Sequence, residues 1–114
     1  MKNESTFTGW LMKKLRSSGA WVVKIHGHAA QQPGLPDLKV EHPRWSGWIE
    51  LKYGRGKLSM LQEIVIKDIR RAGGKVAVIR WDDGIKIDSC DEVESLIQVL
   101  AQGGTELKIC PPTA

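Results

Sequence analysis

The feature that most limits the fold of this chain is the alternation of short β-branched runs with longer stretches that have apolar residues at helical spacing. Short apolar runs bounded by glycine and proline predict strands, whereas apolar residues recurring every three or four positions predict amphipathic helices. We expect strands at 20–25, 37–40, 48–53, 75–81 and 85–87, and helices at 3–18, 59–72 and 91–102. This order predicts an α/β fold in which one mixed sheet is flanked by helices.

The ends of two predicted helices carry recognisable signals. Asn3 is a suitable N-cap for the first helix, and Gly19 follows as a stop signal. In the second, Ser59 and Gln62 match a capping box, in which each side chain bonds the backbone of the other residue. Gly73 and the glycine after it end this helix.

Length and charge narrow the classes of protein to which the chain can belong. Its 114 residues fit a single domain spanning residues 1–114, and its net charge of +4 is compatible with a phosphate-bearing partner. Two cysteines are too few for a disulfide-stapled secreted domain. The first residues lack the apolar core of a signal peptide, and no apolar run is long enough to cross a membrane. We therefore expect a soluble cytoplasmic protein with no membrane association.

The predicted strand WIELKY places an acidic and a basic side chain together. Because side chains alternate along a strand, Trp48, Glu50 and Lys52 share one face. Glu50 and Lys52 are about 7 Å apart along that face. An isolated E-x-K pattern is common on a solvated face, where it forms an ordinary ion pair. Alone, the pattern fits either a surface salt bridge or part of a reactive site.

Asp37 favours the reactive site. It follows Gly34-Leu35-Pro36, where glycine permits an unusual backbone turn and proline stiffens the approach to the strand. The alternative is an aspartate that caps a turn. A short gap between strands can bring Asp37 and Glu50 together, and two carboxylates with a backbone carbonyl and water form an oxygen-rich site suited to Mg²⁺. Such an ion can orient water beside a phosphodiester, while Lys52 stabilises negative oxygens.

Other basic residues and two histidines lie close in sequence to these groups. Arg55 and Lys57 occupy the turn directly after WIELKY, where phosphate contact and simple exposure are equally expected. Lys24 shares a strand face with His26 and can meet phosphate, although a solvated lysine is the more common outcome. His26 and His28 lack further zinc-type ligands nearby, so we expect His26 to line the site or face a nucleic acid rather than bind zinc.

Five tryptophans are many for a chain of this length. Core packing explains most of them, because an indole ring buries a large apolar area. Trp45 and Trp48 have a second interpretation, as side chains that wedge against bases or contact another subunit.

Three short motifs follow one another in the chain: G-L-P-D ending at Asp37, I-E-L-K ending at Lys52, and S-M-L-Q ending at Gln62. Their order and spacing resemble the PD-(D/E)XK nuclease superfamily, and within it a stand-alone VRR-NUC domain. The resemblance covers residues 4–81, and the segment GGKVAVIRW is similar to the closing strand of that family. It implies a restriction-endonuclease-like core with the element order αβββαβ.

The same resemblance implies a metal-dependent phosphodiesterase. Asp37, Glu50 and the backbone carbonyl of Leu51 would ligate Mg²⁺ or Mn²⁺, and Lys52 would be the catalytic lysine. Gln62 matches a glutamine that the family places near the site, and this role is compatible with its place in the capping box.

Glu4 matches an acidic residue that the first helix of the family often contributes; its alternative is an ordinary acid in a first helical turn. Stand-alone VRR-NUC proteins are similar to Holliday junction resolvases, so the resemblance implies cleavage of branched DNA that leaves 5′-phosphate and 3′-hydroxyl ends. Symmetric cutting of two strands needs two sites, hence a homodimer. The alternatives are a restriction or repair nuclease on flap or linear DNA, and a non-catalytic DNA-binding module. A small independent nuclease suits a phage or mobile element.

Overall fold

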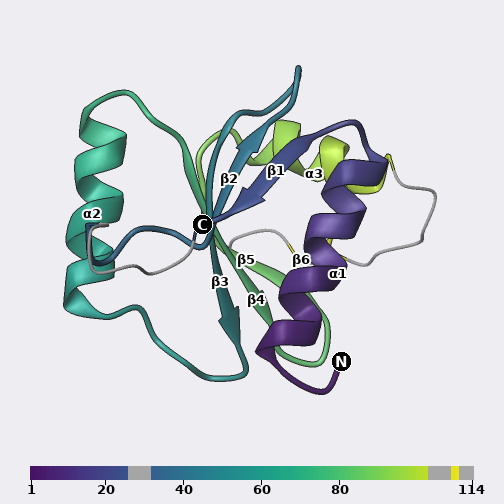
Figure 1. Cartoon of the computed structure of the whole chain (residues 1–114), viewed down its shortest axis with the longest axis horizontal. Coiled ribbons are helices and arrows are strands. Elements are labelled where there is room, and N and C mark those ends of the chain that lie inside the picture. The colour runs from purple at the N-terminus through teal and green to yellow at the C-terminus, as the bar shows by residue number, and fades with distance from the viewer. Residues whose placement is uncertain (26–31, 103–108, 111–114) are drawn as a thin grey trace.

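The structure, a computed structural model, describes residues 1–25, 32–102 and 109–110. Its centre is a six-stranded mixed sheet in which the strands follow one another in chain order. Helices flank the sheet on both faces (Figure 1). The elements are α1 (Glu4–Ser17), β1 (Trp21–Lys24), β2 (Leu38–Glu41), β3 (Gly47–Tyr53), α2 (Met60–Arg71), β4 (Val76–Trp81), β5 (Ile85–Cys90), α3 (Val93–Ala101) and β6 (Ile109–Cys110).

The sheet changes strand direction at its centre. Strands β1, β2 and β3 are antiparallel, β3 and β4 are parallel, β4 and β5 are antiparallel, and β5 and β6 are parallel. A parallel pair needs a crossover connection, and α2 provides it between β3 and β4. This crossover places α2 alone on one face, while α1 and α3 lie on the other (Figure 1).

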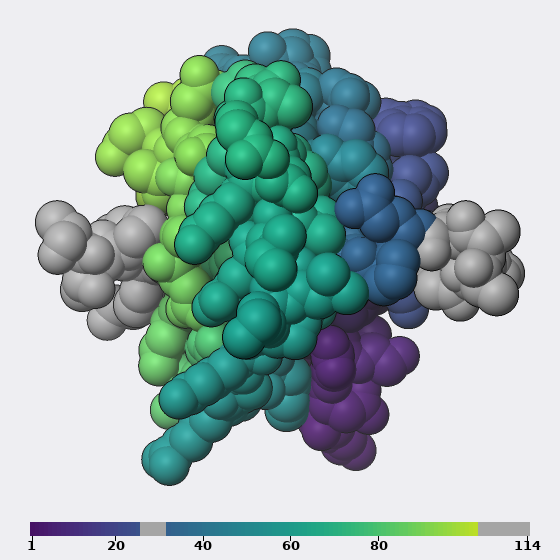
Figure 2. Space-filling model, turned by 90° about the vertical axis from the view of Figure 1, so that its left-hand side faces the viewer, coloured from purple at the N-terminus to yellow at the C-terminus, as the bar shows by residue number. Residues whose placement is uncertain are grey.

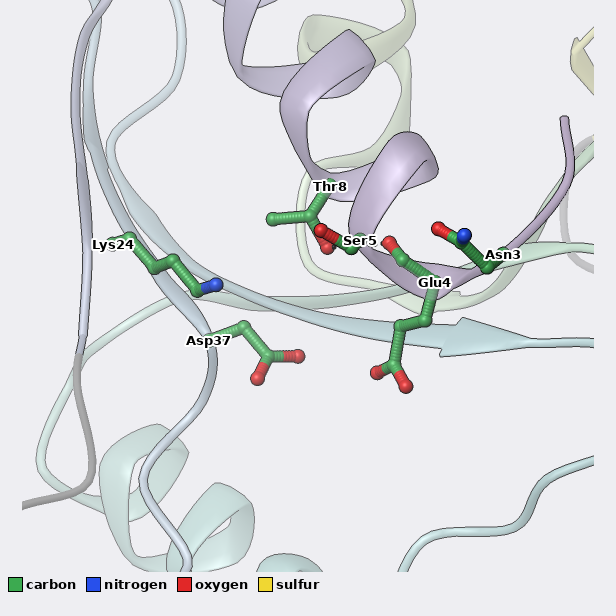
Figure 3. Close-up of a pocket in the computed structure, with 6 residues that line it drawn as sticks. All are labelled: Asn3, Glu4, Ser5, Thr8, Lys24 and Asp37. Atoms are coloured by element: carbon green, nitrogen blue, oxygen red, sulfur yellow. Dashed lines mark hydrogen bonds between the residues drawn. The ribbon is translucent and has the colours of Figure 1, made fainter.

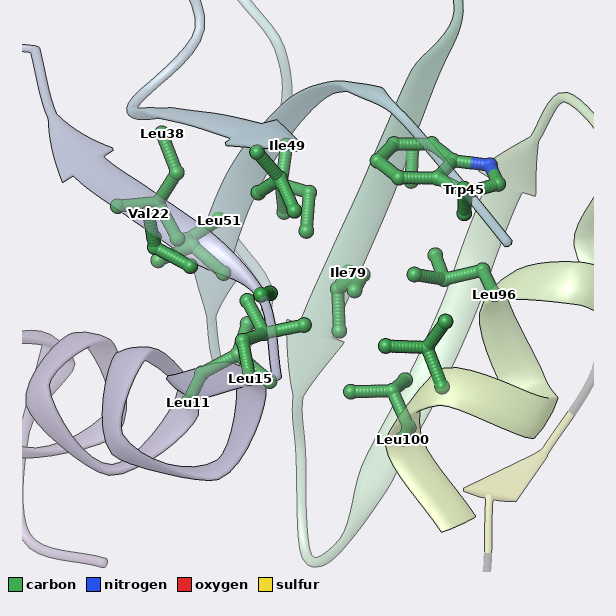
Figure 4. Packing of buried hydrophobic residues seen from close by; sticks show 14 of the residues in the cluster. Leu11, Leu15, Val22, Leu38, Trp45, Ile49, Leu51, Ile79, Leu96 and Leu100 are labelled. Carbon is green, nitrogen blue, oxygen red and sulfur yellow. The ribbon is translucent and has the colours of Figure 1, made fainter. Parts of the chain in front are cut away.

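The main core lies between the sheet and the pair α1 and α3 (Figure 4). Leu11 and Leu15 of α1 and Leu100 of α3 are fully buried there, as the helical spacing of these residues predicts. From the sheet, Ile49 and Leu51 point into the same core, because residues two apart in a strand share a face.

The opposite face of the sheet packs against α2 with a smaller apolar cluster. Val76 and Val78 of β4 meet Ile66 of α2, and Trp48 packs against their edge. Glu50 and Lys52 alternate with the core residues of β3, so their side chains lie on this face with Trp48. The apolar contact therefore holds α2 beside a polar stretch of the central strand.

Most predicted elements are confirmed to within a residue or two, as is usual for element ends. The second strand begins at Leu38, one residue later than predicted, because Pro36 has no N–H with which to extend the ladder. The fifth strand continues to Cys90 because its pairing with β4 persists beyond a bulge at Val78. The last helix starts at Val93, since Glu92 before it has a left-handed backbone with φ 52°. Strand β6 was not predicted.

Trp45 corrects one expectation. Its side chain is 2% exposed within the main core, and its indole N–H donates to the Asp91 carbonyl at 2.8 Å. A ring so placed cannot wedge between bases or contact a second subunit. Trp48 is partly buried, with the Lys39 ammonium 5.3 Å from its ring centroid. Within the described residues, the structure contains no helix with the length and apolar character of a membrane span.

Candidate active site

Asp37 stands at the end of β2, directly beside the centre of β3. The register pairs Leu38 with Ile49, so continuing the antiparallel pairing by one step places Asp37 opposite Glu50. Its Oδ2 accepts a 2.8 Å hydrogen bond from the Leu51 N–H. The carboxylate thus bonds the neighbouring strand, where the β2–β3 ladder has ended, and the interpretation of Asp37 as a simple turn cap is wrong.

Glu50 is a buried carboxylate, with a side chain only 2% exposed. Its Oε2 accepts a 2.8 Å hydrogen bond from Gln62 Nε2 and lies 3.4 Å from Lys52 Nζ. Its other oxygen, Oε1, is buried with no hydrogen-bond partner. Lys52 is itself only 16% exposed. The alternative of a solvated surface salt bridge is therefore wrong, and one buried carboxyl oxygen has no partner among the described residues.

The charges around Glu50 are unbalanced. The pKa of Glu50 is raised to about 7, first by burial and then by the negative charge of Asp37, while Lys52 opposes both effects. Two carboxylates held this close in a partly desolvated place repel each other, and one lysine does not compensate fully. A cation between them would favour the ionised form of both groups.

Gln62 connects these groups to α2. Its backbone N–H donates to Ser59 Oγ at 3.1 Å, and its Oε1 accepts from the Ser59 N–H at 2.9 Å, which completes the capping box. The same Oε1 accepts from Lys52 Nζ at 3.2 Å, while Nε2 donates to Glu50. One side chain therefore completes the helix cap and also contacts Glu50 and Lys52, while the role of Gln62 in an active site stays a prediction.

A hollow of about 400 Å³ opens between the start of α1 and the ends of β1 and β2. Glu4, Lys24 and Asp37 line it, with the carboxylates of Glu4 and Asp37 and the Lys24 ammonium directed toward a common space (Figure 3). Asn3 caps α1 by accepting from the Thr6 N–H at 2.8 Å, which fixes the first turn that carries Glu4. The structure thus brings Glu4 and Lys24, which lie in separate elements, to the side of Asp37.

The basic turn after β3, residues 54–57, carries Arg55 and Lys57. Both side chains are exposed, and among the described residues neither forms an ion pair. In the space-filling view of the α2 side, the segment between β3 and α2 forms the lower edge of the molecule (Figure 2). His26 and His28 lie outside the described residues.

The donors present fit a hard divalent ion. Glu50 Oε1 is a buried oxygen without a partner, and Asp37 stands opposite it. Within a strand the N–H and C=O of one residue face the same neighbour, so the Leu51 carbonyl faces the side on which Asp37 lies. In the described part of the chain no three or more His, Cys, Asp or Glu side chains form a metal-binding group. Two carboxylates suit Mg²⁺, which usually keeps water and substrate phosphate in its shell.

The fold is shared with a solved nuclease. The chain is similar to the 1.6 Å structure of Hjc from Archaeoglobus fulgidus, a Holliday junction resolvase from an archaeal hyperthermophile. The TM-score is 0.53 at 21% sequence identity, over 68% of this chain and 67% of that one. This likeness confirms the predicted restriction-endonuclease-like fold. No family model and no curated protein matches the sequence.

Proposed function

We propose that this protein is a metal-dependent endonuclease that hydrolyses phosphodiester bonds in branched DNA, with four-way junctions as its preferred substrate. The observation that carries the proposal is the meeting of Asp37, at the start of β2, with Glu50 and Lys52 of the neighbouring strand β3, where Glu50 Oε1 is buried and has no partner among the described residues. A structural ion pair does not need a second carboxylate beside it, because like charges raise the cost of burial.

Each residue of the site has a separate task in this proposal. Asp37, Glu50 and the Leu51 carbonyl would hold Mg²⁺ or Mn²⁺, which supplies Lewis acidity toward the phosphodiester and acidifies water when bound. Lys52 Nζ, kept in place by Glu50 and Gln62, offers a positive charge to the phosphate oxygens as negative charge develops there.

The groups around the hollow extend this arrangement. Glu4 faces the space beside Asp37, and we propose that it bonds water near the ion rather than the ion itself. Lys24, Arg55 and Lys57 provide positive charge for the DNA backbone on either side of the cleavage point. His26 lies outside the described residues, and its sequence position is the basis on which we propose that it faces DNA.

Two observations support a branched substrate. The solved structure with the same fold is a Holliday junction resolvase, and the spacing of the G-L-P-D, I-E-L-K and S-M-L-Q motifs resembles stand-alone VRR-NUC domains. Recognition would rest on the charge and shape of the backbone rather than on base edges. Paired cuts in a symmetric junction require two copies of the site, so we propose a homodimer as the active form.

The deciding experiment incubates the purified protein with a labelled four-way junction, a flap and a linear duplex, with Mg²⁺ and with EDTA. We expect cleavage of the junction that requires the metal. Preferential cutting of the flap or the linear duplex would indicate a repair or restriction-type nuclease instead.

Variants at the site separate catalysis from DNA binding. Asp37→Asn and Lys52→Gln are expected to lose cleavage while retaining the folded circular dichroism spectrum. Calorimetric titration of Mn²⁺ should detect a site in the wild-type protein and a much weaker one in Asp37→Asn. A protein that binds DNA but neither cuts it nor binds Mn²⁺ would be a non-catalytic module.

A further inference from the structure

We propose that Arg80 is a positioning residue that holds the basic turn after β3 in the form that meets DNA phosphates. The inference rests on the proposed function for its ligand, DNA, but the contacts that carry it belong to the chain alone. Arg80 lies in β4 directly beside Lys52 in the parallel register, on the same face of the sheet.

The guanidinium of Arg80 bonds three partners. Its Nη1 donates to the Gly54 carbonyl at 2.7 Å and to the Gly56 carbonyl at 2.6 Å. Its Nε and Nη2 both lie 2.9 Å from Oδ2 of Asp88 in β5. Most of the donors of a guanidinium are therefore used inside the protein, and the side chain is only 17% exposed. Arg80 is consequently poorly placed to bind phosphate itself.

The turn that Arg80 holds would otherwise have few constraints. Gly54 has φ +68°, which glycine adopts readily, and a Cβ added at this position would meet nothing within 4 Å. Gly54 is also held through its own N–H, which donates to the Trp81 carbonyl at 2.7 Å. Two glycines in a short turn increase the number of conformations that binding must restrict. Bonds to both of their carbonyls fix the turn on either side of Arg55.

The consequence concerns Arg55 and Lys57. Both are exposed and, within the described residues, have no acidic partner, so their charges are available for phosphate. The turn begins two residues after Lys52, so the DNA strand that reaches the proposed site must pass close to it. A fixed turn presents the two cations to neighbouring phosphates without a further ordering cost at binding, which is the usual benefit of preorganisation.

The test uses Arg80→Lys, which keeps the net charge at +4 and removes the multiple bonds of the guanidinium. Binding of a four-way junction is measured in EDTA between about 50 and 200 mM salt. We expect the Kd to rise about tenfold at low salt, and the slope of log K against log salt to fall by about 1 to 2, as expected when one or two phosphate contacts are lost. In the Arg80→Lys background, Arg55→Gln with Lys57→Gln should weaken binding less than in the wild type.

A second readout does not depend on DNA. Amide hydrogen exchange of the free protein should become faster at residues 54–57 in Arg80→Lys, and should stay unchanged at α3. Unchanged exchange in the turn overturns the proposal. Faster exchange with a wild-type salt slope overturns it equally, because the turn would then be held for a purpose other than DNA binding.

Controls separate this inference from the loss of one charge and from the failure of the proposed function. Arg71→Gln removes a cation at the far end of α2, where it pairs with Asp68, and should leave the salt slope at its wild-type value. If Arg80→Lys fails to fold, Asp88→Asn is the alternative variant, because it removes the charge that pairs with Arg80. Asp88→Asn should change the salt slope and the exchange rate in the same direction, to a smaller extent. If neither readout changes, the proposal is overturned. A wild-type protein that does not cleave DNA would contradict the nuclease proposal, while the binding and exchange results would still decide the role of Arg80.

Discussion

Gln62 combines two tasks that are usually given to separate residues. The helix cap requires its Oε1 beside the Ser59 N–H, and the site requires the same oxygen beside Lys52. Both are met because α2 begins over the face of β3 that carries Glu50 and Lys52. The first turn of α2 therefore sets the positions of Glu50 and Lys52, and one amide links the stability of the helix to the proposed chemistry of the site.

Substitutions at positions 59 and 62 should separate these two tasks. Ser59→Ala removes the cap but leaves the Gln62 side chain able to reach Glu50 and Lys52, whereas Gln62→Ala removes both functions. We expect each to lower the free energy of unfolding by about 1 kcal/mol. Only Gln62→Ala should slow junction cleavage, by about 10- to 100-fold, as for other residues that orient metal ligands. Urea denaturation and single-turnover cleavage measure the two effects, and equal cleavage by both variants contradicts this division.

We expect the Glu50 carboxylate to lower the stability of the fold and yet to be required for cleavage. Its carboxylate is buried, has one unpartnered oxygen and stands close to the negative charge of Asp37. Glu50→Gln keeps the shape and the acceptor for Gln62 while removing the charge. In EDTA we expect this variant to be more stable than the wild type by about 1 kcal/mol, with a Tm several degrees higher, and to be inactive in Mg²⁺.

The matched control for Glu50→Gln is Glu63→Gln. Glu63 is an exposed acid in the first turn of α2, and the same chemical change there relieves no burial. Its Tm and its cleavage rate should stay close to those of the wild type. A Tm for Glu50→Gln at or below the wild-type value would mean that the protein already satisfies this carboxylate.

At the scale of the elements, the sequence predicts what depends on local pattern. The helices and most of the strands follow from apolar spacing, and the capping box at Ser59 follows from two residues three apart. That Glu50 and Lys52 share a face follows from strand alternation alone. Asp37 was identified from its place after Gly34 and Pro36, and the short gap between the two strands predicted that it meets Glu50.

Other features of the site depend on register and packing, which the local pattern does not contain. The burial of Glu50 results from the position of α2 over β3, and the place of Glu4 and Lys24 beside Asp37 results from the packing of α1 against the sheet. The role of Arg80 was not predicted from the sequence, because this residue ends an apolar run, VAVIR, that is typical of a buried strand. A polar residue two positions after Val78, and hence on the same face, was the available signal.

Gly34 should matter because it joins the loop before Asp37 to α2. Its φ is +82°, and an added Cβ would lie 2.9 Å from Leu61 Cγ and 3.1 Å from Val65 Cγ2. We expect Gly34→Ala to cost about 2 to 3 kcal/mol, from backbone strain plus displacement of the loop. It should also slow cleavage, because Asp37 follows three residues later. Urea denaturation and a junction assay measure the two effects.

Gly73→Ala is the corresponding control. Gly73 has a similar φ of +93°, but an added Cβ meets nothing within 4 Å. Its cost should be limited to backbone strain, about 1 kcal/mol, and cleavage should be unchanged. If the two alanine variants lose the same stability, then the contact between the loop and α2 contributes little.

At the scale of the whole molecule, size and charge limit how the protein can act. The chain extends 38 × 31 × 30 Å, so its longest dimension matches about 11 base pairs at 3.4 Å each. The described residues hold one set of Asp37, Glu50 and Lys52, which under the proposed function would provide one cut per copy. Two symmetric cuts in a four-way junction therefore require two copies, related by the two-fold axis of the substrate.

Mixing active and inactive copies tests this requirement directly. Lys52→Gln is expected to fold and to associate as the wild type does, since the Lys52 ammonium bonds Glu50 and Gln62 of its own site. On a supercoiled plasmid that extrudes a cruciform, wild-type protein should cut both strands and give linear product. A tenfold excess of Lys52→Gln should convert the product from linear to nicked circles, because most active copies are then paired with an inactive one. Linear product that only declines in amount, with no gain in nicked circles, would show that copies act independently, and a monomer by light scattering would agree with that result.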